Sequence, residues 1–255
     1  MSTKTVQFRQ SFRTITPYVV VPAAEAMIAF LKQAFGAEET LRHVSGPGMI
    51  HAEVRIGDSM MMIGGGAGYT GPAKPTAIHI YVANSDEVYR RALDAGAVST
   101  LEMTEAHGER FGCVQDPFGN PWIIATHLGG HYIAEQHHTV TPFVYAKGAA
   151  RFIDFLKQAF GAQELLRVDL PDGIVKHAKM RIGDSVLATG EAEQLPALPT
   201  MLYLYVPDAD ASYNQAIRAG AQSIHPPADQ PYGDRNGGVT DAWGNQWYIA
   251  TPLAT

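Results

Sequence analysis

Hydrophobic residues follow two spacings along this chain, one typical of helices and one typical of strands. Between Ala24 and Phe35 the apolar residues recur every three or four positions, and Gly36 follows directly. Such a stripe predicts an amphipathic helix that ends at the glycine. Before it, Ile15–Val21 is rich in β-branched residues and ends at Pro22, which is typical of a strand.

The first helix is followed by three predicted strands, and the order of strand, helix and three strands then repeats. Asn84, with Glu87 three residues later, can cap the second helix, which runs to Gly96. The other predicted strands are Glu39–Val44, Met49–Ile56, Ser59–Ile63, Thr76–Val82, Ser99–Thr104, Arg110–Gln115 and Pro121–Thr126.

The chain contains two copies of this unit. The string FLKQAFGA occurs at Phe30–Ala37 and at Phe155–Ala162, and Arg-Ile-Gly-Asp-Ser begins at both Arg55 and Arg181. A repeat of this length is a whole domain rather than a solenoid unit of roughly 20–50 residues. We therefore predict one domain at residues 14–127, a linker at 128–138 and a second domain at 139–252, with helices near Ala149–Phe160 and Asp210–Ala219.

Alternation along the strands separates an aliphatic face from a mixed one. In Met49–Ile56 the aliphatic residues alternate with His51, Glu53 and Arg55. We expect the helices to cover the aliphatic face and the mixed face to curve into a cup for a small ligand. The candidate ligand-binding residues are Tyr18, Glu53, Arg55, His79, Tyr81, Arg110, Phe143, Lys179, Tyr203, Tyr205, Arg235 and Tyr248.

Two kinds of residue on or beside this face also permit other interpretations. His51 and His177 suit proton abstraction in a pocket, and each equally suits a repeated structural hydrogen bond. Arg110 and Arg235 follow an acidic residue in both copies, so each can bind an anionic group or pair with a neighbouring carboxylate such as Glu109.

Composition narrows the classes of partner. The chain is 46% hydrophobic and 17% charged, with a net charge of −6, which favours a globular protein and gives no reason to expect nucleic acid. No stretch approaches the roughly 20 apolar residues of a membrane span, and the N-terminus has no apolar segment of signal-peptide length. Cys113 is the only cysteine, so we expect no intrachain disulfide and a cytoplasmic location.

Several motifs together resemble the vicinal oxygen chelate superfamily, which includes glyoxalase I, dioxygenases and bleomycin-resistance proteins, and in particular its PhnB-like branch. They are TPYVVV at Thr16, FLKQAFGA at Phe30, HAEVRIGDS at His51, GERFG at Gly108 and DPFGNPW at Asp116. The resemblance implies an α+β fold of two tandem glyoxalase-like domains, each with two βαβββ modules that form a curved mixed sheet with helices outside.

The resemblance also implies where a divalent metal would be held, but the residues there are not metal ligands. The implied positions are Thr16, Met61, Ala77, Ile123, Thr141, Leu187, Met201 and Tyr248. Divalent metals in proteins need several converging imidazole, carboxylate or thiolate donors. We therefore expect no metal cofactor at this site, whether each cup forms within one copy or from exchanged halves. His51, Glu53 and His79 are the alternative, displaced donor set.

The expected function is binding of a small, partly apolar metabolite or xenobiotic by two copies that pack as an internal pseudo-dimer in a monomeric chain. The alternative is a lyase, isomerase or dioxygenase of the same superfamily that uses a displaced metal or His51 and His177 as acid–base groups. The copies differ on the mixed face, where His79 corresponds to Tyr203 and Glu53 to Lys179.

Overall fold

The computed structural model describes residues 11–192 and 198–253 and confirms the predicted order of elements in both copies. The first copy contains β1 (Ile15–Val21), α1 (Ala24–Phe35), β2 (Glu38–Ser45), β3 (Met49–Ile56), β4 (Ser59–Gly65), β5 (Ala77–Tyr81), α2 (Ser85–Asp94), β6 (Val98–Ala106), β7 (Glu109–Gln115) and β8 (Pro121–His127). The second contains β9 (Val140–Ala146), α3 (Ala149–Phe160), β10 (Gln163–Asp169), β11 (Val175–Ile182), β12 (Ser185–Glu191), β13 (Met201–Tyr205), α4 (Ala209–Arg218), β14 (Gln222–Asp229), β15 (Asp234–Thr240) and β16 (Gln246–Pro252).

The first helix of each copy ends as its sequence predicts. Gly36 and Gly161 adopt the left-handed conformation, with φ of 66° and 64°, and their N–H groups bond to carbonyls of the last turn. Glycine occupies this position without the steric cost that a Cβ brings. In α2 the Asn84 side chain accepts a hydrogen bond from the Glu87 N–H, which is the predicted N-cap.

The strands form two eight-stranded mixed sheets, so the class is α+β, as predicted. One sheet has the order β14-β15-β16-β13-β1-β4-β3-β2 and the other β10-β11-β12-β9-β5-β8-β7-β6. Each sheet therefore contains four strands from each copy. The first and last strands of a βαβββ module pair in parallel, as β1 with β4 and β5 with β8, and the chain crosses over between them.

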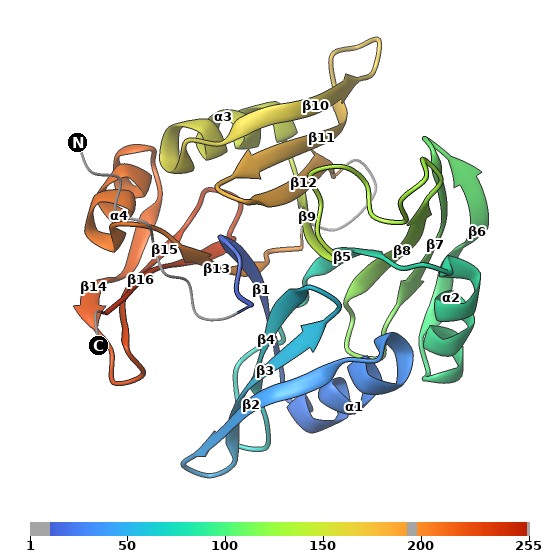
Figure 1. Ribbon diagram of the computed structural model, residues 1–255. Helices are drawn as coiled ribbons and strands as arrows, with labels where there is room; N and C mark the ends of the chain where they lie inside the picture. The colour runs from blue at the N-terminus through green and yellow to red at the C-terminus, as the bar shows by residue number, and fades with distance from the viewer. Residues whose placement is uncertain (1–10, 193–197, 254–255) are drawn as a thin grey trace. The chain divides into compact units, whose positions relative to one another are not determined.

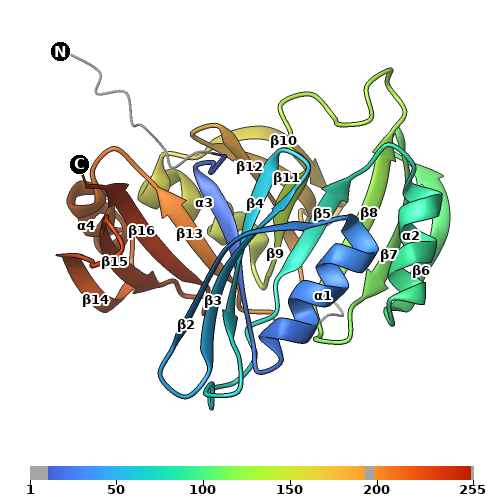
Figure 2. The ribbon, with the colours of Figure 1, turned by 60° about the horizontal axis from the view of Figure 1, so that its bottom comes forward.

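The chain divides into two compact units whose boundaries fall inside β1 and β9. One unit is Pro17–Phe143, and the other combines the described parts of Met1–Thr16 and Val144–Thr255. In the first unit α1 and α2 pack against each other and cover one side of the strands (Figure 1), as a second view also shows (Figure 2). In the other unit α3 and α4 do the same.

The helices and the strand faces beneath them enclose the hydrophobic cores. Ile78, Ile80, Trp122 and Ile124 are fully buried in the core of the first unit, and Leu202, Leu204, Trp247 and Ile249 are their counterparts in the second. We call the opposite face of each set of strands, which carries the alternate residues, the non-core face. Since strand side chains alternate, its members are fixed once the core is known.

The repeated Gly-Asp-Ser turn fastens the start of a strand. In the first unit, Asp58 Oδ1 accepts the Thr139 N–H at 2.8 Å and Ser59 Oγ accepts the Val140 N–H at 3.0 Å. Gly57 has a φ of +57°, and a Cβ there would lie 2.9 Å from Thr139 Cγ2 and closer still to Oγ1. These contacts explain why the turn and the Thr-x-Thr-Pro strand start are repeated together.

The second unit repeats this arrangement with the start of β1. Asp184 Oδ1 accepts the Thr14 N–H at 2.8 Å, and Ser185 Oγ accepts the Ile15 N–H at 2.9 Å. Burial raises the pKa of Asp184, but hydrogen bonds from Thr14 and Ser185 outweigh burial and leave the pKa below its usual value. The folded protein therefore favours the ionised form of the Asp184 carboxylate.

In the described ranges no helix has the length and apolar character needed to cross a lipid bilayer.

Candidate functional site

A carboxylate, an imidazole and a phenol meet on the non-core face of the first unit. His79 and Tyr81 alternate with the core residues of β5, and Glu109 is the first residue of β7. The Tyr81 hydroxyl donates to Glu109 Oε1 at 2.5 Å, and His79 Nε2 lies 3.2 Å from Glu109 Oε2. We call His79, Tyr81 and Glu109 the His–Glu–Tyr cluster.

The cluster is largely shielded from water. The side chains of His79 and Glu109 are 13% and 16% exposed, and Tyr81 is buried. Burial, and then the hydrogen bond to Glu109, raise the pKa of Tyr81 well above its usual value. Tyr81 is therefore a neutral donor that holds the carboxylate in place.

The second unit has a related cluster at the corresponding positions. Asp234, the first residue of β15, accepts the Tyr203 hydroxyl at 2.7 Å and the Tyr205 hydroxyl at 3.3 Å. Burial first, and then the Asp234 charge, raise the pKa of Tyr203. We call Tyr203, Tyr205 and Asp234 the Asp–Tyr–Tyr cluster. A carboxylate with two ring partners thus recurs on the non-core face of both copies.

Sequence reasoning named the rings of both clusters but treated the two acids only as partners for the adjacent arginines. The missed signal was the strand boundary. Because β7 begins at Glu109 and side chains alternate, Glu109 and Arg110 must point to opposite faces.

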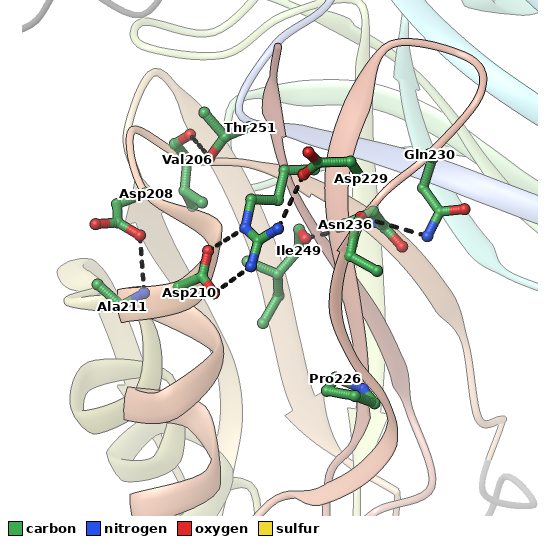
Figure 3. A network of polar contacts seen from close by, with 12 residues as sticks. Val206, Asp208, Asp210, Ala211, Pro226, Asp229, Gln230, Asn236, Ile249 and Thr251 are labelled. Carbon is green, nitrogen blue, oxygen red and sulfur yellow. Dashed lines mark hydrogen bonds and ion pairs between the residues drawn. The ribbon is translucent and has the colours of Figure 1, made fainter.

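Arg110 and Arg235 lie on the helix side and pair with the first turn of a helix. Arg110 donates to Asp86 at 3.0 and 2.7 Å. In the second unit the Arg235 guanidinium donates to Asp210, in the first turn of α4, and to Asp229, at the end of β14 (Figure 3). The hydrogen bonds from these arginines lower the pKa values of Asp86 and Asp210.

His51 belongs to a separate polar group in the first unit. The Tyr18 hydroxyl lies 3.0 Å from His51 Nδ1, and His51 Nε2 lies 3.7 Å from Glu53 Oε1. Glu53 is 4% exposed, whereas the His51 side chain is 35% exposed. Arg55, the third polar residue on this face of β3, forms an exposed ion pair with Glu38.

The other predicted site residues also follow the strand alternation. Phe143 on β9 is buried opposite Ala77, and His177 and Lys179 are half-buried on the side of β11 that alternates with the core. Tyr248 on β16 is the parallel neighbour of Tyr203. Their roles in binding, and that of His177 in proton transfer, stay predictions.

The residues at the implied positions do not fit the metal centre that the family resemblance implies. Two implied positions were misplaced by one residue, because Met61 and Leu187 belong to the cores and the non-core face carries Met60, Met62, Val186 and Ala188 instead. The corrected positions offer only thioether and aliphatic groups. Within the described part of the chain the Thr16 hydroxyl is buried and has no hydrogen-bond partner, yet one neutral hydroxyl is not a divalent-metal site.

The displaced donor set is not assembled either. His51 and Glu53 lie on β3 and His79 lies on β5, and these strands belong to different sheets. Across residues 11–192 and 198–253, no three His, Cys, Asp or Glu side chains converge as a metal site would require. We derive no chemical step through a metal.

Comparison with known proteins gives the same family twice along the chain. The model of the Glyoxalase/Bleomycin resistance protein/Dioxygenase superfamily matches residues 13–124 and 135–249. An uncharacterized protein of Mycobacterium bovis is 36% identical over 126 residues, which are 45% of this chain and 83% of the relative. A Mycobacterium tuberculosis relative has the same identity, with 45% and 74% covered.

Solved structures agree at the level of the fold. Glyoxalase I from Zea mays aligns with a TM-score of 0.73 at 15% identity and covers 94% of this chain and 92% of its own. A Bacillus subtilis protein proposed to be a dioxygenase aligns with a TM-score of 0.66 at 14% identity, with 94% and 84% covered. Identities this low indicate a shared fold and leave the reaction open.

Proposed function

Because the chain belongs to the Glyoxalase/Bleomycin resistance protein/Dioxygenase superfamily, we propose that it binds a small, partly apolar organic molecule on its non-core faces, without the usual metal site. The observation that carries this proposal is the recurrence of a carboxylate held by two ring side chains, Glu109 in one copy and Asp234 in the other. The assignment to the PhnB-like branch stays a prediction.

A structural role alone gives little reason for these clusters. Each core is apolar and lies on the other side of the strands, so the clusters add nothing to core packing. Removing a carboxylate from water is unfavourable unless several donors compensate it. A fold that retains such a group twice, each time next to aromatic rings, has the composition of a small-molecule site, in which a few polar groups stand in apolar surroundings.

Metal analysis tests the metal-free part of the proposal. Freshly purified protein is expected to contain only substoichiometric Zn, Ni, Fe and Mn. A stoichiometric metal that is lost in His51→Ala or His79→Ala would contradict it.

Binding is tested with indole and 1-methylindole, two small aromatic probes, by ligand-observed NMR and thermal shift. We expect Glu109→Gln to weaken binding of at least one probe, since the substitution disturbs the His–Glu–Tyr cluster. Arg110→Gln is the matched control, because it changes the adjacent residue on the opposite face. Equal effects of the two substitutions, or no binding of either probe to the wild type, would refute the proposal.

A second candidate function is acid–base catalysis by His51. Its half-exposed imidazole is held by Tyr18 and faces the buried Glu53, which is the arrangement of an oriented base. If this function holds, a bound ligand with an acidic C–H exchanges that proton for deuterium in D2O, and His51→Gln stops the exchange. The corresponding substitution His177→Gln tests the second copy.

We further propose that the two copies act as an internal pseudo-dimer, so that the protein is monomeric. Light scattering after size-exclusion chromatography is expected to give the mass of one chain, 27.6 kDa.

A further inference from the structure

We propose that His79 Nδ1 is a hydrogen-bond acceptor for the ligand, and that the first copy therefore selects small, neutral aromatic molecules that carry an N–H or O–H donor. This inference rests on the proposed function and names the ligand chemistry of one of its two sites.

The contact between His79 and Glu109 determines the tautomer of the imidazole. An ionised carboxylate only accepts hydrogen bonds, so the contact between His79 Nε2 and Glu109 Oε2, at 3.2 Å, places the proton on Nε2. In the neutral imidazole, the state to which the proposal applies, a proton on Nε2 leaves Nδ1 unprotonated and able only to accept. Tyr81 donates to the other oxygen of the same carboxylate, so both Glu109 oxygens accept a hydrogen bond.

Among the described residues, His79 Nδ1 is buried and has no hydrogen-bond partner. Buried polar atoms in folded proteins are nearly always paired, and an exception calls for a functional explanation. A donor on a bound molecule would complete the hydrogen bonding of the imidazole.

Apolar and aromatic residues neighbour the imidazole. The cross-strand neighbours of His79 are Ile123 on β8 and Thr141 on β9, and the next pair on the same face of β5 and β9 is Ala77 and Phe143. The Tyr81 ring lies 4.4 Å from the His79 ring, measured between centroids. These groups suit an apolar, aromatic body with a single donor. Both Glu109 oxygens already have partners, so the donor of the ligand is expected to bond to Nδ1.

The second copy has a different ring, with different hydrogen bonds, at the position of His79. Tyr203 replaces His79, and its hydroxyl donates to Asp234. The Asp–Tyr–Tyr cluster therefore satisfies its own polar groups, whereas the His–Glu–Tyr cluster leaves one acceptor. The two copies thus differ in the ligand they recognise.

Indole and 1-methylindole test the proposal, because indole has one donor and its methyl derivative has none. We expect wild-type protein to bind indole about tenfold more tightly than 1-methylindole, the effect of about one net hydrogen bond. In His79→Phe this preference falls to about one, whereas Arg110→Gln, on the helix side of β7, leaves it unchanged. Comparing ratios of affinities cancels differences in probe size.

A spectroscopic readout accompanies the affinities. Long-range ¹H–¹⁵N correlation spectra are expected to show His79 protonated on Nε2, with the Nδ1 shift moving on addition of indole and not of 1-methylindole. If His79→Phe does not fold, His79→Tyr, which installs the residue of the second copy, replaces it. In that variant the indole preference is expected to fall as well.

The outcomes separate this inference from the proposed function. Equal binding of both probes, a preference that survives in His79→Phe, or a proton on Nδ1 would overturn the inference and leave the proposed function standing. Failure of both probes to bind wild-type protein would overturn both.

Discussion

Gly57→Ala should destabilise the protein far more than its backbone conformation alone requires. Gly57 and Gly36 have similar left-handed φ angles, +57° and +66°, so an alanine at either position carries the same kind of backbone strain. A Cβ at Gly36 would meet none of the described residues within 4 Å, whereas a Cβ at Gly57 would lie 2.9 Å from Thr139 Cγ2 and nearer to its hydroxyl. Gly36→Ala is therefore a matched control.

The magnitude follows from these two contributions. The left-handed conformation costs an alanine about 1–2 kcal/mol, and the lower entropy of the unfolded chain returns about 0.4–1 kcal/mol. Gly36→Ala should thus cost about 1 kcal/mol. At Gly57 the overlap with Thr139 adds about 1–3 kcal/mol, as overpacking does elsewhere. Thr139 cannot simply move away, because its N–H and hydroxyl both bond to Asp58.

Urea unfolding followed by circular dichroism measures both variants, with the slope of the transition checked for constancy. Adding Thr139→Ala to Gly57→Ala should recover part of the loss, and a double-mutant cycle gives the coupling. In the second copy, Gly183→Ala and Gly161→Ala form the same pair, with Thr14 as the crowded neighbour. Equal losses for Gly57→Ala and Gly36→Ala would refute the reasoning.

Three further predictions concern charge and reactivity. Because the pKa of Asp184 is lowered in the folded state, its ionised form contributes stability above its unfolded pKa, near 3.9, and this contribution is lost as pH falls through the folded pKa. Asp184→Asn should therefore flatten the acid limb of a curve of unfolding free energy against pH. An unchanged limb would contradict the lowered pKa. Burial raises the pKa of Cys113 to about 11. The rate at which iodoacetamide alkylates this thiol should therefore keep rising with pH well beyond 8.5, the usual thiol pKa. A plateau of the rate near that pH would contradict the burial of Cys113. Arg235→Gln removes the ion pairs with Asp210 and Asp229 on the helix side, so it should lower the unfolding midpoint slightly and leave probe binding unchanged. A loss of probe binding would indicate that Arg235 belongs to the binding site.

Local patterns were enough to predict most of the fold. The structure places helix α1 at Ala24–Phe35 and strand β3 at Met49–Ile56, the bounds expected from the positions of glycine and of apolar residues. Both signals act within a few residues, through the left-handed cap at Gly36 and through side-chain alternation. The one-residue error at Met61 arose because three methionines in succession, Met60–Met62, carry no alternation that could set the register.

The site was only partly predictable for a related reason. The rings of His79 and Tyr81 were expected on the non-core face, because alternation along one strand is local. Their carboxylate partner comes from β7, 28 residues beyond Tyr81, and nothing in the local pattern pairs it with β5. The free acceptor on His79 depends on that pairing, since Glu109 decides which ring nitrogen carries the proton.

The sequence by itself determined that the chain is a duplicated βαβββ protein with one aliphatic face per set of strands, because turn residues and hydrophobic period are properties of short segments. It also determined that the copies differ, with histidine at 79 and tyrosine at 203. Only the tertiary structure decided that each eight-stranded sheet takes four strands from each copy and that Glu109 faces His79 while Arg110 faces a helix. The physical reason is that sheet order and hydrogen-bond partners depend on contacts between residues far apart in the chain, which local propensities do not specify.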